Sequence, residues 1–190
     1  MLRAHCAEIA SKKSMMEESR RYDTKHGSVT LRRERAGDAP FLLSLFASHA
    51  GRALCKAGLP EDAVAKLISF QHRSADATHH AMFPNAAYSI IECDGEPIGR
   101  LIEEDEGDTV YYVDFALLPE RQMKGLGTAF IEMVSDEWAA AGKAARVEVL
   151  VNNEPSLKLC RYCGFAEVER SANGYVQLRR EMRGRHSSGA

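Results

Sequence analysis

Residues 113–128 place the strongest constraint on how this chain can fold. The apolar run 113–118 ends at Pro119, and a polar turn that contains Gly125 and Gly127 follows it. Apolar residues then recur at positions 126, 129, 130, 133, 134, 138 and 141, which lie on one face of an α-helix. The pattern predicts a strand, a glycine turn and a helix over about 125–141, in immediate succession.

A turn of this kind is suited to bind phosphate. The first four N–H groups of a helix lack partners within the helix, and the helix dipole places partial positive charge beside them. Gly125 and Gly127 have no Cβ atom, so an anion can approach the main chain closely, and Lys124 adds a positive charge. A Walker loop does not fit, because Lys124 precedes the glycine. A dinucleotide fingerprint does not fit either, because no third glycine follows Gly127 in register.

The remaining periodicities predict a mixed α/β (α+β) fold. Strand patterns occur at 28–33, 88–93, 97–103, 109–118, 145–151, 166–170 and 175–180. Helical patterns occur at about 38–51, from 61 to about 70, at 125–141 and from 152 to 163. The predicted order is β-α-α-β-β-β-α-β-α-β-β, and the sheet is mostly antiparallel. Strands 109–118 and 145–151 are expected to be parallel, because a single helix connects them.

Two short blocks resemble the motifs of the GNAT superfamily of acyl-CoA-dependent N-acyltransferases. Residues 122–127 read Q-M-K-G-L-G and resemble the family's R/Q-x-x-G-x-G/A. Residues 153–165 read N-E-P-S-L-K-L-C-R-Y-C-G-F and resemble N-x-x-A-x-x-L-Y-x-x-x-G-F. The resemblance covers about residues 28–180. It implies a GNAT-like domain at 28–182, a helical or disordered N-terminal extension at 1–27 and a flexible tail at 183–190.

The resemblance implies acetyl-CoA as co-substrate and no metal. In the family the two parallel strands spread apart, the pantetheine arm of coenzyme A pairs with the first strand, and the glycine turn holds the pyrophosphate. The residues that this assigns to cofactor binding are Phe115, Ala116, Leu117, Leu118, Gln122, Met123, Lys124, Gly125, Leu126, Gly127, Thr128, Asn153, Ser156 and Cys160.

The implied reaction is transfer of an acetyl group to a primary amine by direct attack in a ternary complex. A backbone N–H near Leu117 would face the thioester oxygen. Asp114 would act as base or amine anchor, or would simply pair with an arginine; Tyr111, Tyr112 and Glu148 are weaker candidates.

Cys160 occupies the position where the family usually has a tyrosine that protonates the departing thiolate. With an ordinary thiol pKa of about 8.5, a cysteine gains little as a proton donor to coenzyme A. Either the thiolate leaves unaided, or a water or another tyrosine serves. The substitution also leaves open a different class of function, a non-catalytic acyl-CoA-binding or sensor module of the same fold.

Composition bounds the partners and the compartment. The 25 basic and 27 acidic residues are spread along the chain, so no nucleic acid partner is predicted. No apolar run approaches the thickness of a bilayer, so no membrane partner is predicted. Five scattered cysteines fit reduced thiols and a cytoplasmic protein. The acceptor is a small-molecule or peptide amine that the sequence does not name, and a homodimer is an open option because dimers are common among relatives.

Three other patterns have simpler interpretations. The pair Cys160 and Cys163 closes a helix, whereas redox C-x-x-C motifs begin one. His79 and His80 could bind metal together with His72, but seven histidines in such a chain do not require it. The acidic run 103–108 is interpreted as a solvated hairpin turn rather than as an attractant for a cationic substrate.

Overall fold

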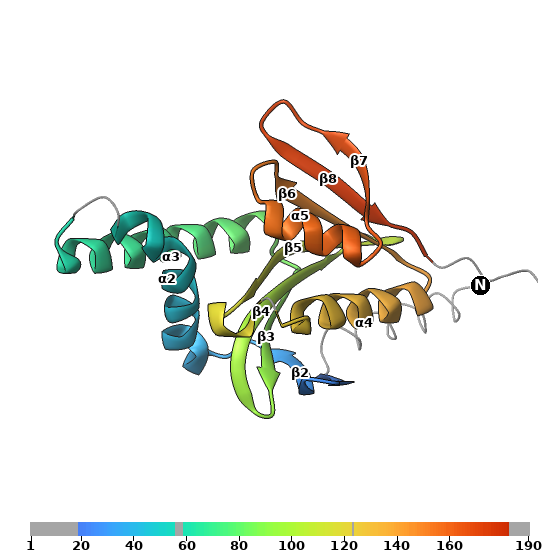
Figure 1. The fold of residues 1–190 in the computed structure, drawn as a ribbon, viewed down its shortest axis with the longest axis horizontal. Helices are drawn as coiled ribbons and strands as arrows, with labels where there is room; N and C mark the ends of the chain where they lie inside the picture. Colours follow the sequence, from blue (N-terminus) through green and yellow to red (C-terminus); the bar gives the residue numbers. More distant parts are fainter. Residues whose placement is uncertain (1–18, 56–58, 123, 183–190) are drawn as a thin grey trace, which may run out of the picture. The chain divides into compact units, whose positions relative to one another are not determined.

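The computed structural model describes residues 19–55, 59–122 and 124–182. The expectations for residues 1–18, for Met123 and for the tail 183–190 lie outside the described residues. The elements, in chain order (Figure 1), are β1 (Arg20–Thr24), β2 (Gly27–Arg33), η1 (Ala36–Asp38), α2 (Ala39–Cys55), α3 (Glu61–Met82), β3 (Ala87–Cys93), β4 (Glu96–Asp105), β5 (Thr109–Leu117), η2 (Pro119–Arg121), α4 (Leu126–Ala140), β6 (Ala144–Leu150), α5 (Glu154–Tyr162), β7 (Ala166–Arg170) and β8 (Tyr175–Arg180).

The strands form one mixed sheet in the order β1-β2-β3-β4-β5-β6-β8-β7. β5 and β6 are parallel, with Thr109 opposite Ala144 and Tyr112 opposite Val147. The pairs β1–β2, β2–β3, β6–β8 and β7–β8 are antiparallel. The predicted fold class, a mixed sheet containing one parallel pair joined by a helix, is therefore confirmed.

Two expectations about the first half of the chain are wrong. The sequence assigns residues 20–24 to a helical or disordered extension, but they form β1, which pairs with β2 from Arg20↔Leu31 to Thr24↔Gly27. Arg20 and Tyr22 are buried and the residue between them is exposed, which is the alternation of a strand. The sequence does not reveal this alternation, because a charged residue occupies a buried position. The sequence also predicts that the first long helix ends near Gly51, but α2 continues to Cys55.

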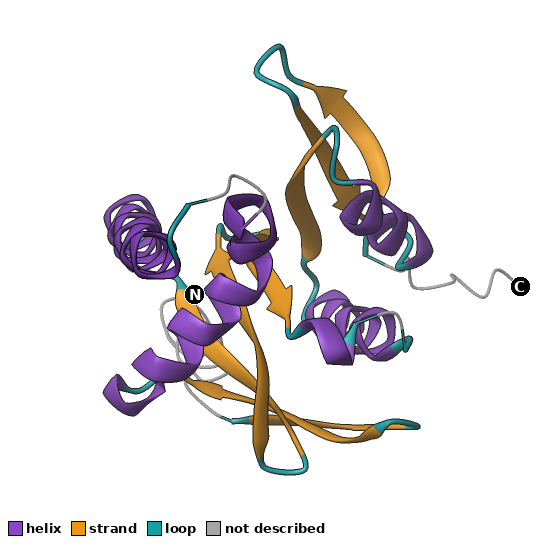
Figure 2. Cartoon of the chain, turned by 60° about the vertical axis from the view of Figure 1, so that its left-hand side comes forward, coloured by secondary structure: helices purple, strands orange, loops and turns teal. Residues whose placement is uncertain are grey.

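The described chain is organised in two compact units. The first contains residues 19–55, 59–102 and 114–122, and the second contains residues 103–113 and 124–182, so that β4 and β5 contribute to both. In the first unit α2 and α3 pack against each other (Figure 2). Its buried core residues include Val29, Leu31, Leu42, Leu45, Val64, Ile68, Ile90, Ile91, Ile98 and Leu101.

The core of the second unit forms around α4. The buried face of this helix contains Leu126, Phe130, Val134 and Trp138 of the predicted spacing, but Gly127, Ile131 and Ser135 complete it, while positions 129 and 133 are only half-buried. The other buried positions come from the strands and from the end of α5. The buried core residues of this unit include Phe130, Val134, Trp138, Val110, Leu157, Phe165, Val176 and Leu178.

The acidic run 103–108 is not a fully solvated turn: residues 106–108 are exposed as expected, but the interpretation is wrong for Glu103 and Asp105. Glu103 is fully buried and accepts a hydrogen bond of 2.7 Å from the indole N–H of Trp138. Asp105 pairs with buried Lys143, and Glu106 pairs with Arg146. Basic and indole groups brought in by α4 and β6 satisfy these acids, and nothing local in the run indicates that.

Gly99 allows β4 to approach the end of β5 closely. A Cβ atom at this position would clash with the carbonyl oxygen of Ala116 and would lie 2.6 Å from Leu117 Cδ2. One of these neighbours is backbone, so it cannot move aside as a flexible side chain would. The position of the last two residues of β5 therefore depends on the missing side chain of Gly99.

We expect Gly99→Ala to lower the free energy of unfolding by about 1–3 kcal/mol, because the added methyl overpacks the Ala116–Leu117 backbone. Urea denaturation followed by circular dichroism measures the change. Gly37→Ala is the matched control, because nothing lies within 4 Å of a Cβ atom built there and its φ is not positive. Equal losses in the two variants would contradict the close approach.

Candidate functional site

The end of β5 is fixed by hydrogen bonds to its last carbonyl and to the following amide. The Leu117 carbonyl oxygen accepts from Gln122 Nε2 at 2.7 Å and contacts His49 Nε2 at 3.0 Å. A carbonyl can only accept, so the histidine tautomer in this arrangement carries its proton on Nε2. The Leu118 amide donates to the Ile98 carbonyl at 2.9 Å. Gln122 therefore closes the turn, and the Leu118 N–H is already used by β4.

The predicted phosphate-binding turn leads directly into α4. Gly125 is the N-cap of this helix, with φ 80° and ψ −6°, in the left-handed region that favours glycine. A glycine N-cap has no side-chain oxygen, so it cannot accept from the N–H groups of the first turn. Lys124 and Gly125 are exposed, while Leu126 and Gly127 are buried. The first turn carries no acidic residue. These residues fit a bound diphosphate, because amides and a lysine are offered without a competing carboxylate.

The second sequence motif lies against the first turn of α4. Asn153 caps α5, with its Oδ1 accepting from the Ser156 amide at 3.3 Å. At the other end of α5, the Cys163 thiol donates to the Thr128 carbonyl at 3.6 Å. The two blocks that resemble family motifs therefore meet in the second unit, 35 residues apart in the chain at this contact. In this structure Asn153 acts as a helix cap, and no ligand contact is assigned to it.

The parallel ladder between β5 and β6 is short. Among the described residues, the register records four pairs, and the last is Tyr112↔Val147. β5 nevertheless continues to Leu117, and β6 continues to Leu150, where it pairs with Tyr175 of β8. The ladder thus ends before Asp114, Phe115, Ala116 and Leu117, the strand residues that the sequence predicts to lie beside the thioester.

Cys160 is buried and poorly suited to donate a proton. It is 6% exposed, and burial raises the pKa of its thiol to about 11, against a smaller lowering by Arg161. A thiol with this pKa is a weaker acid than an ordinary thiol. Tyr162 is 81% exposed, and Tyr112 bonds to Ser135 Oγ at 3.0 Å. Tyr111 lies 3.6 Å from the Arg146 guanidinium carbon, stacked against it.

Asp114 belongs to a line of ion pairs in the first unit. Its Oδ2 accepts from Arg100 Nε at 3.1 Å and from Nη2 at 2.8 Å. The same arginine donates to Asp76 Oδ1 at 3.4 Å, and Asp76 Oδ2 lies 3.8 Å from His80 Nε2. Arg100 is only 8% exposed, so these carboxylates compensate a nearly buried charge. Of the alternatives predicted for Asp114, pairing with an arginine is the one observed.

Two titratable side chains near this line, His79 and Glu34, each have one buried atom without a hydrogen-bond partner. Burial is the largest effect on His79 and lowers its pKa, while Asp114 partly opposes that change. Its Nδ1 is buried and has no hydrogen-bond partner. Burial raises the pKa of Glu34, and Arg100 opposes that rise. Glu34 Oε2 is likewise buried without a hydrogen-bond partner.

Sequence reasoning missed Glu34, Asp76 and Arg100, and it considered His79 only as a metal ligand. One signal was present in the sequence. Asp76, His79 and His80 are spaced at i, i+3 and i+4, which places them on one helix face. No local pattern indicates that Arg100, within an apolar strand, reaches that face.

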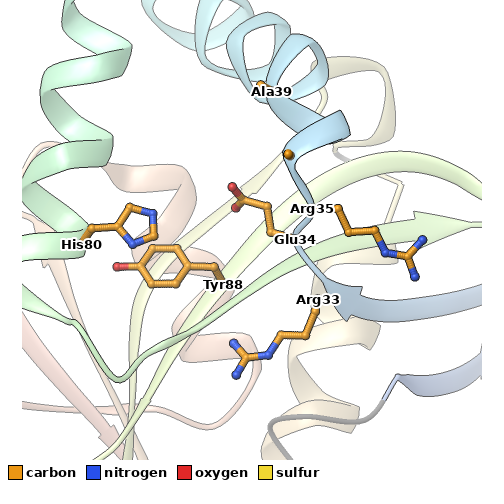
Figure 3. Close-up of a pocket in the computed structure, with 7 residues that line it drawn as sticks. Arg33, Glu34, Arg35, Ala39, His80 and Tyr88 are labelled. Atoms are coloured by element: carbon orange, nitrogen blue, oxygen red, sulfur yellow. The ribbon is translucent and has the colours of Figure 1, made fainter.

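A cavity of about 460 Å³ opens beside Glu34 (Figure 3). His80 and Tyr88 form one wall with their rings stacked, 4.0 Å between centroids and 21° between planes. The segment that enters α2 forms the opposite wall with two alanines. The full lining is Arg33, Glu34, Arg35, Ala36, Ala39, His80 and Tyr88. Figure 3 shows the Glu34 carboxylate pointing toward the histidine side, the Arg35 guanidinium pointing the opposite way and the Arg33 guanidinium lying below Tyr88.

Within residues 19–55, 59–122 and 124–182, no group of three or more His, Cys, Asp or Glu side chains could hold a metal ion. Over the same ranges, no helix is long and apolar enough to cross a bilayer.

Comparison with known proteins identifies a family. The sequence of residues 57–165 matches the family described as acetyltransferase (GNAT) family, and this match covers more than half of the chain. None of the curated proteins matches the sequence.

Solved structures of similar fold agree with that match. PaiA N-acetyltransferase from Thermoplasma acidophilum, in complex with coenzyme A, is 12% identical with a TM-score of 0.59, over 80% of this chain and 98% of that one. Mycobacterium smegmatis RimJ, in complex with CoA-disulfide, is 18% identical with a TM-score of 0.58, over 85% of each chain. RimL, a ribosomal L7/L12 alpha-N-protein acetyltransferase, is 16% identical with a TM-score of 0.58, over 87% of this chain and 96% of that one. At these identities the likeness establishes the fold.

We expect Cys160 and Cys163 to resist alkylation in the native protein. Burial raises their pKa values to about 11 and about 12, so the reactive thiolate is scarce at pH 8, on the order of one molecule in 10³ or fewer. Iodoacetamide labelling followed by peptide mass spectrometry measures the modification at each residue. The same protein in 8 M urea is the control and should be labelled readily. Fast native labelling of Cys160 would instead mean an accessible, acidic thiol.

Proposed function

Because this chain belongs to the acetyltransferase (GNAT) family, we propose that it transfers an acetyl group from acetyl-CoA to a primary amine of a small molecule or peptide. Transfer occurs by direct attack in a ternary complex, in the cytoplasm. The observation that carries the proposal is the start of α4, where a left-handed glycine N-cap leaves the first-turn amides without a side-chain acceptor. Backbone amides at a helix start without a side-chain cap can donate hydrogen bonds to a diphosphate.

Acetyl-CoA supplies an activated acetyl thioester. We assign its diphosphate to the amides of residues 125–128, with the exposed ammonium of Lys124 adding positive charge. Gln122 acts indirectly, because its hydrogen bond to the Leu117 carbonyl fixes the turn that leads to those amides. We assign the pantetheine arm to backbone groups of residues 115–117, as the family resemblance implies. We also assign Ser156 and Cys160 to the neighbourhood of the cofactor, as the family resemblance implies.

The acceptor amine must lose a proton as its nitrogen attacks the acetyl carbon and the carbon–sulfur bond breaks. His79 is suited to accept this proton, because burial favours its neutral form and its Nδ1 has no partner. Asp114 is suited to orient the amine, since its carboxylate is held in place by Arg100. In the proposed reaction the proton passes to the imidazole of His79, and the thiolate leaves without help from Cys160, whose pKa is too high.

The kind of acceptor is supported by the names of the neighbours. RimL is named as an acetyltransferase for the α-amino group of a ribosomal protein, and PaiA is named as an N-acetyltransferase. A primary amine acceptor and a cytoplasmic site of action are consistent with both. The described cysteines, Cys93, Cys160 and Cys163, are all free thiols, which also suits a reducing compartment.

A second candidate is favoured by one observation. Cys160 stands at the position of the family's usual proton-donating tyrosine, and it is buried with a raised pKa. A chain that binds acyl-CoA without turnover, as a sensor, would not need that donor. Thiol release in the presence of an amine panel separates the two candidates, because only the enzyme consumes acetyl-CoA in proportion to amine acetylated.

We expect Lys124→Glu to weaken coenzyme A binding at least tenfold, about 1.4 kcal/mol, because a carboxylate then stands beside the bound diphosphate. Isothermal titration calorimetry measures the affinity. Lys66→Glu is the control, since Lys66 is 81% exposed on α3 and the charge change is the same. If wild-type protein binds no coenzyme A species at all, the proposed function is wrong.

We expect His79→Gln to lower kcat/KM on the order of 10²-fold near neutral pH. The wild type should lose activity as pH falls through the pKa of His79, which burial places below the ordinary value of 6.5, so the neutral form persists to lower pH. His79→Gln should lack this acid limb. His72→Gln is the control, because burial also lowers that pKa but its electrostatic neighbours do not include Asp114. An unchanged pH profile in His79→Gln would contradict the assignment.

A further inference from the structure

The cavity beside Glu34 is not used by any step of the proposed reaction. We infer that it binds a second, positively charged group of the acceptor, an ammonium or guanidinium, with Glu34 as its carboxylate partner. The inference rests on the proposed function, because it specifies the class of amine that the enzyme acetylates: one with a cationic group distant from the reacting nitrogen.

The first argument is the unsatisfied carboxylate. Glu34 Oε2 is buried and has no hydrogen-bond partner, and an ionised carboxylate can only accept hydrogen bonds. Leaving such an atom unpaired in a buried position costs free energy, which a ligand that brings N–H donors and a positive charge removes. Arg100 acts on Glu34 through its charge but donates no hydrogen bond to this atom, and three of its five N–H groups bond to Asp114 and Asp76 instead.

The second argument is the character of the walls. The stacked rings of His80 and Tyr88 offer an aromatic surface, which attracts cations. The Tyr88 hydroxyl donates its proton to the Phe83 carbonyl at 3.2 Å, so this proton is not offered to an anion in the cavity. Arg33 and Arg35 also line the cavity, but Figure 3 shows the Arg35 guanidinium pointing away from the Glu34 carboxylate and the Arg33 guanidinium below Tyr88. On the histidine side of the cavity, the charge in Figure 3 is therefore the Glu34 carboxylate.

The third argument is the position of the cavity along the β3–β4 hairpin. The Glu34 amide donates to the Tyr88 carbonyl at 3.0 Å, whereas the end of β5 is joined to Ile98 through the Leu118 amide. Tyr88 lies three residues further from the Asp94–Gly95 turn than Ile98 does, roughly 10 Å along the hairpin. The two places are also separated across the sheet, because β3 and β4 lie between β2 and β5. An acceptor that reaches both places therefore needs its charged group at least that far from its reacting nitrogen.

The line from His80 through Asp76 and Arg100 to Asp114 spans the same interval. The contacts along it measure 3.8, 3.4 and 2.8 Å in that order, and the last two are ion pairs of Arg100. These contacts connect His80 in the cavity wall with Asp114, the proposed amine anchor, within the first unit. Burial raises the pKa of Glu34, and a bound cation would lower it again, so binding should release a proton or hold the carboxylate ionised.

The test uses three amines of equal length: 1,8-diaminooctane, octylamine and 8-aminooctanoate. Calorimetry with saturating coenzyme A measures the binding of each to wild type, Glu34→Gln and the control Glu61→Gln, whose side chain lies on the exposed start of α3. We expect wild type to prefer the diamine over octylamine at least tenfold. Glu34→Gln should lose that preference, while Glu61→Gln should keep it. The affinity for coenzyme A should be the same in all three proteins.

A peptide arm distinguishes the source of the cationic group. The tripeptide amides Ser-Ala-Lys and Ser-Ala-Met differ in one distal charge. If the protein prefers the lysine peptide to the methionine peptide but does not prefer the diamine to octylamine, the acceptor is a peptide. Equal binding of diamine and octylamine together with equal binding of the two peptides overturns the inference, as does a preference for 8-aminooctanoate or a Glu34→Gln variant that keeps the wild-type preference.

Thiol release measured in parallel keeps the two proposals separate. Acetylation of octylamine with no diamine preference would leave the proposed function intact and remove this inference. Diamine binding that depends on Glu34, without thiol release from any amine, would support the binding site and contradict the acetyltransferase proposal.

Discussion

The start of α4 is the constraint on which the rest of this structure depends. A helix whose N-cap is a left-handed glycine has no side chain to satisfy its first amides, so those amides must meet solvent or a ligand. The surrounding contacts hold that end of the helix in place. Cys163 at the end of α5 donates to Thr128, and the buried face of α4 packs around Trp138, whose indole is bonded to Glu103. A helix start without a side-chain cap is therefore the most specific chemical feature of the second unit.

The first unit has a different character, because its buried polar groups are titratable side chains. Arg100 is nearly buried and is compensated by Asp114 and Asp76, so the strand and α3 are tied by charge as well as by apolar packing. Burying such a network is costly unless each charge is paired. The buried atoms of His79 and Glu34 that remain unpaired are thus places where an external proton donor or cation has much to gain.

Much of this could be predicted from the sequence where the signal is local. The strand patterns at 109–118 and 145–151 and the helix over about 125–141 each depend on a few neighbouring residues, and the structure confirms them. What could not be predicted depends on long-range contacts. β1 is hidden by charged residues whose partners lie in β2, Glu103 is buried by an indole 35 residues away, and Arg100 reaches Asp76 across a helix–sheet packing that no motif encodes. The role of Asp114 is undetermined by sequence for the same reason.

The most direct measurement of the central claim is amide NMR of α4 during titration with coenzyme A and, separately, with pantetheine, which lacks the diphosphate. The account predicts that the amide signals of Leu126, Gly127 and Thr128 shift with coenzyme A and that they remain in place with pantetheine. Shifts confined to other parts of the chain, with those three amides unmoved by coenzyme A, would contradict it.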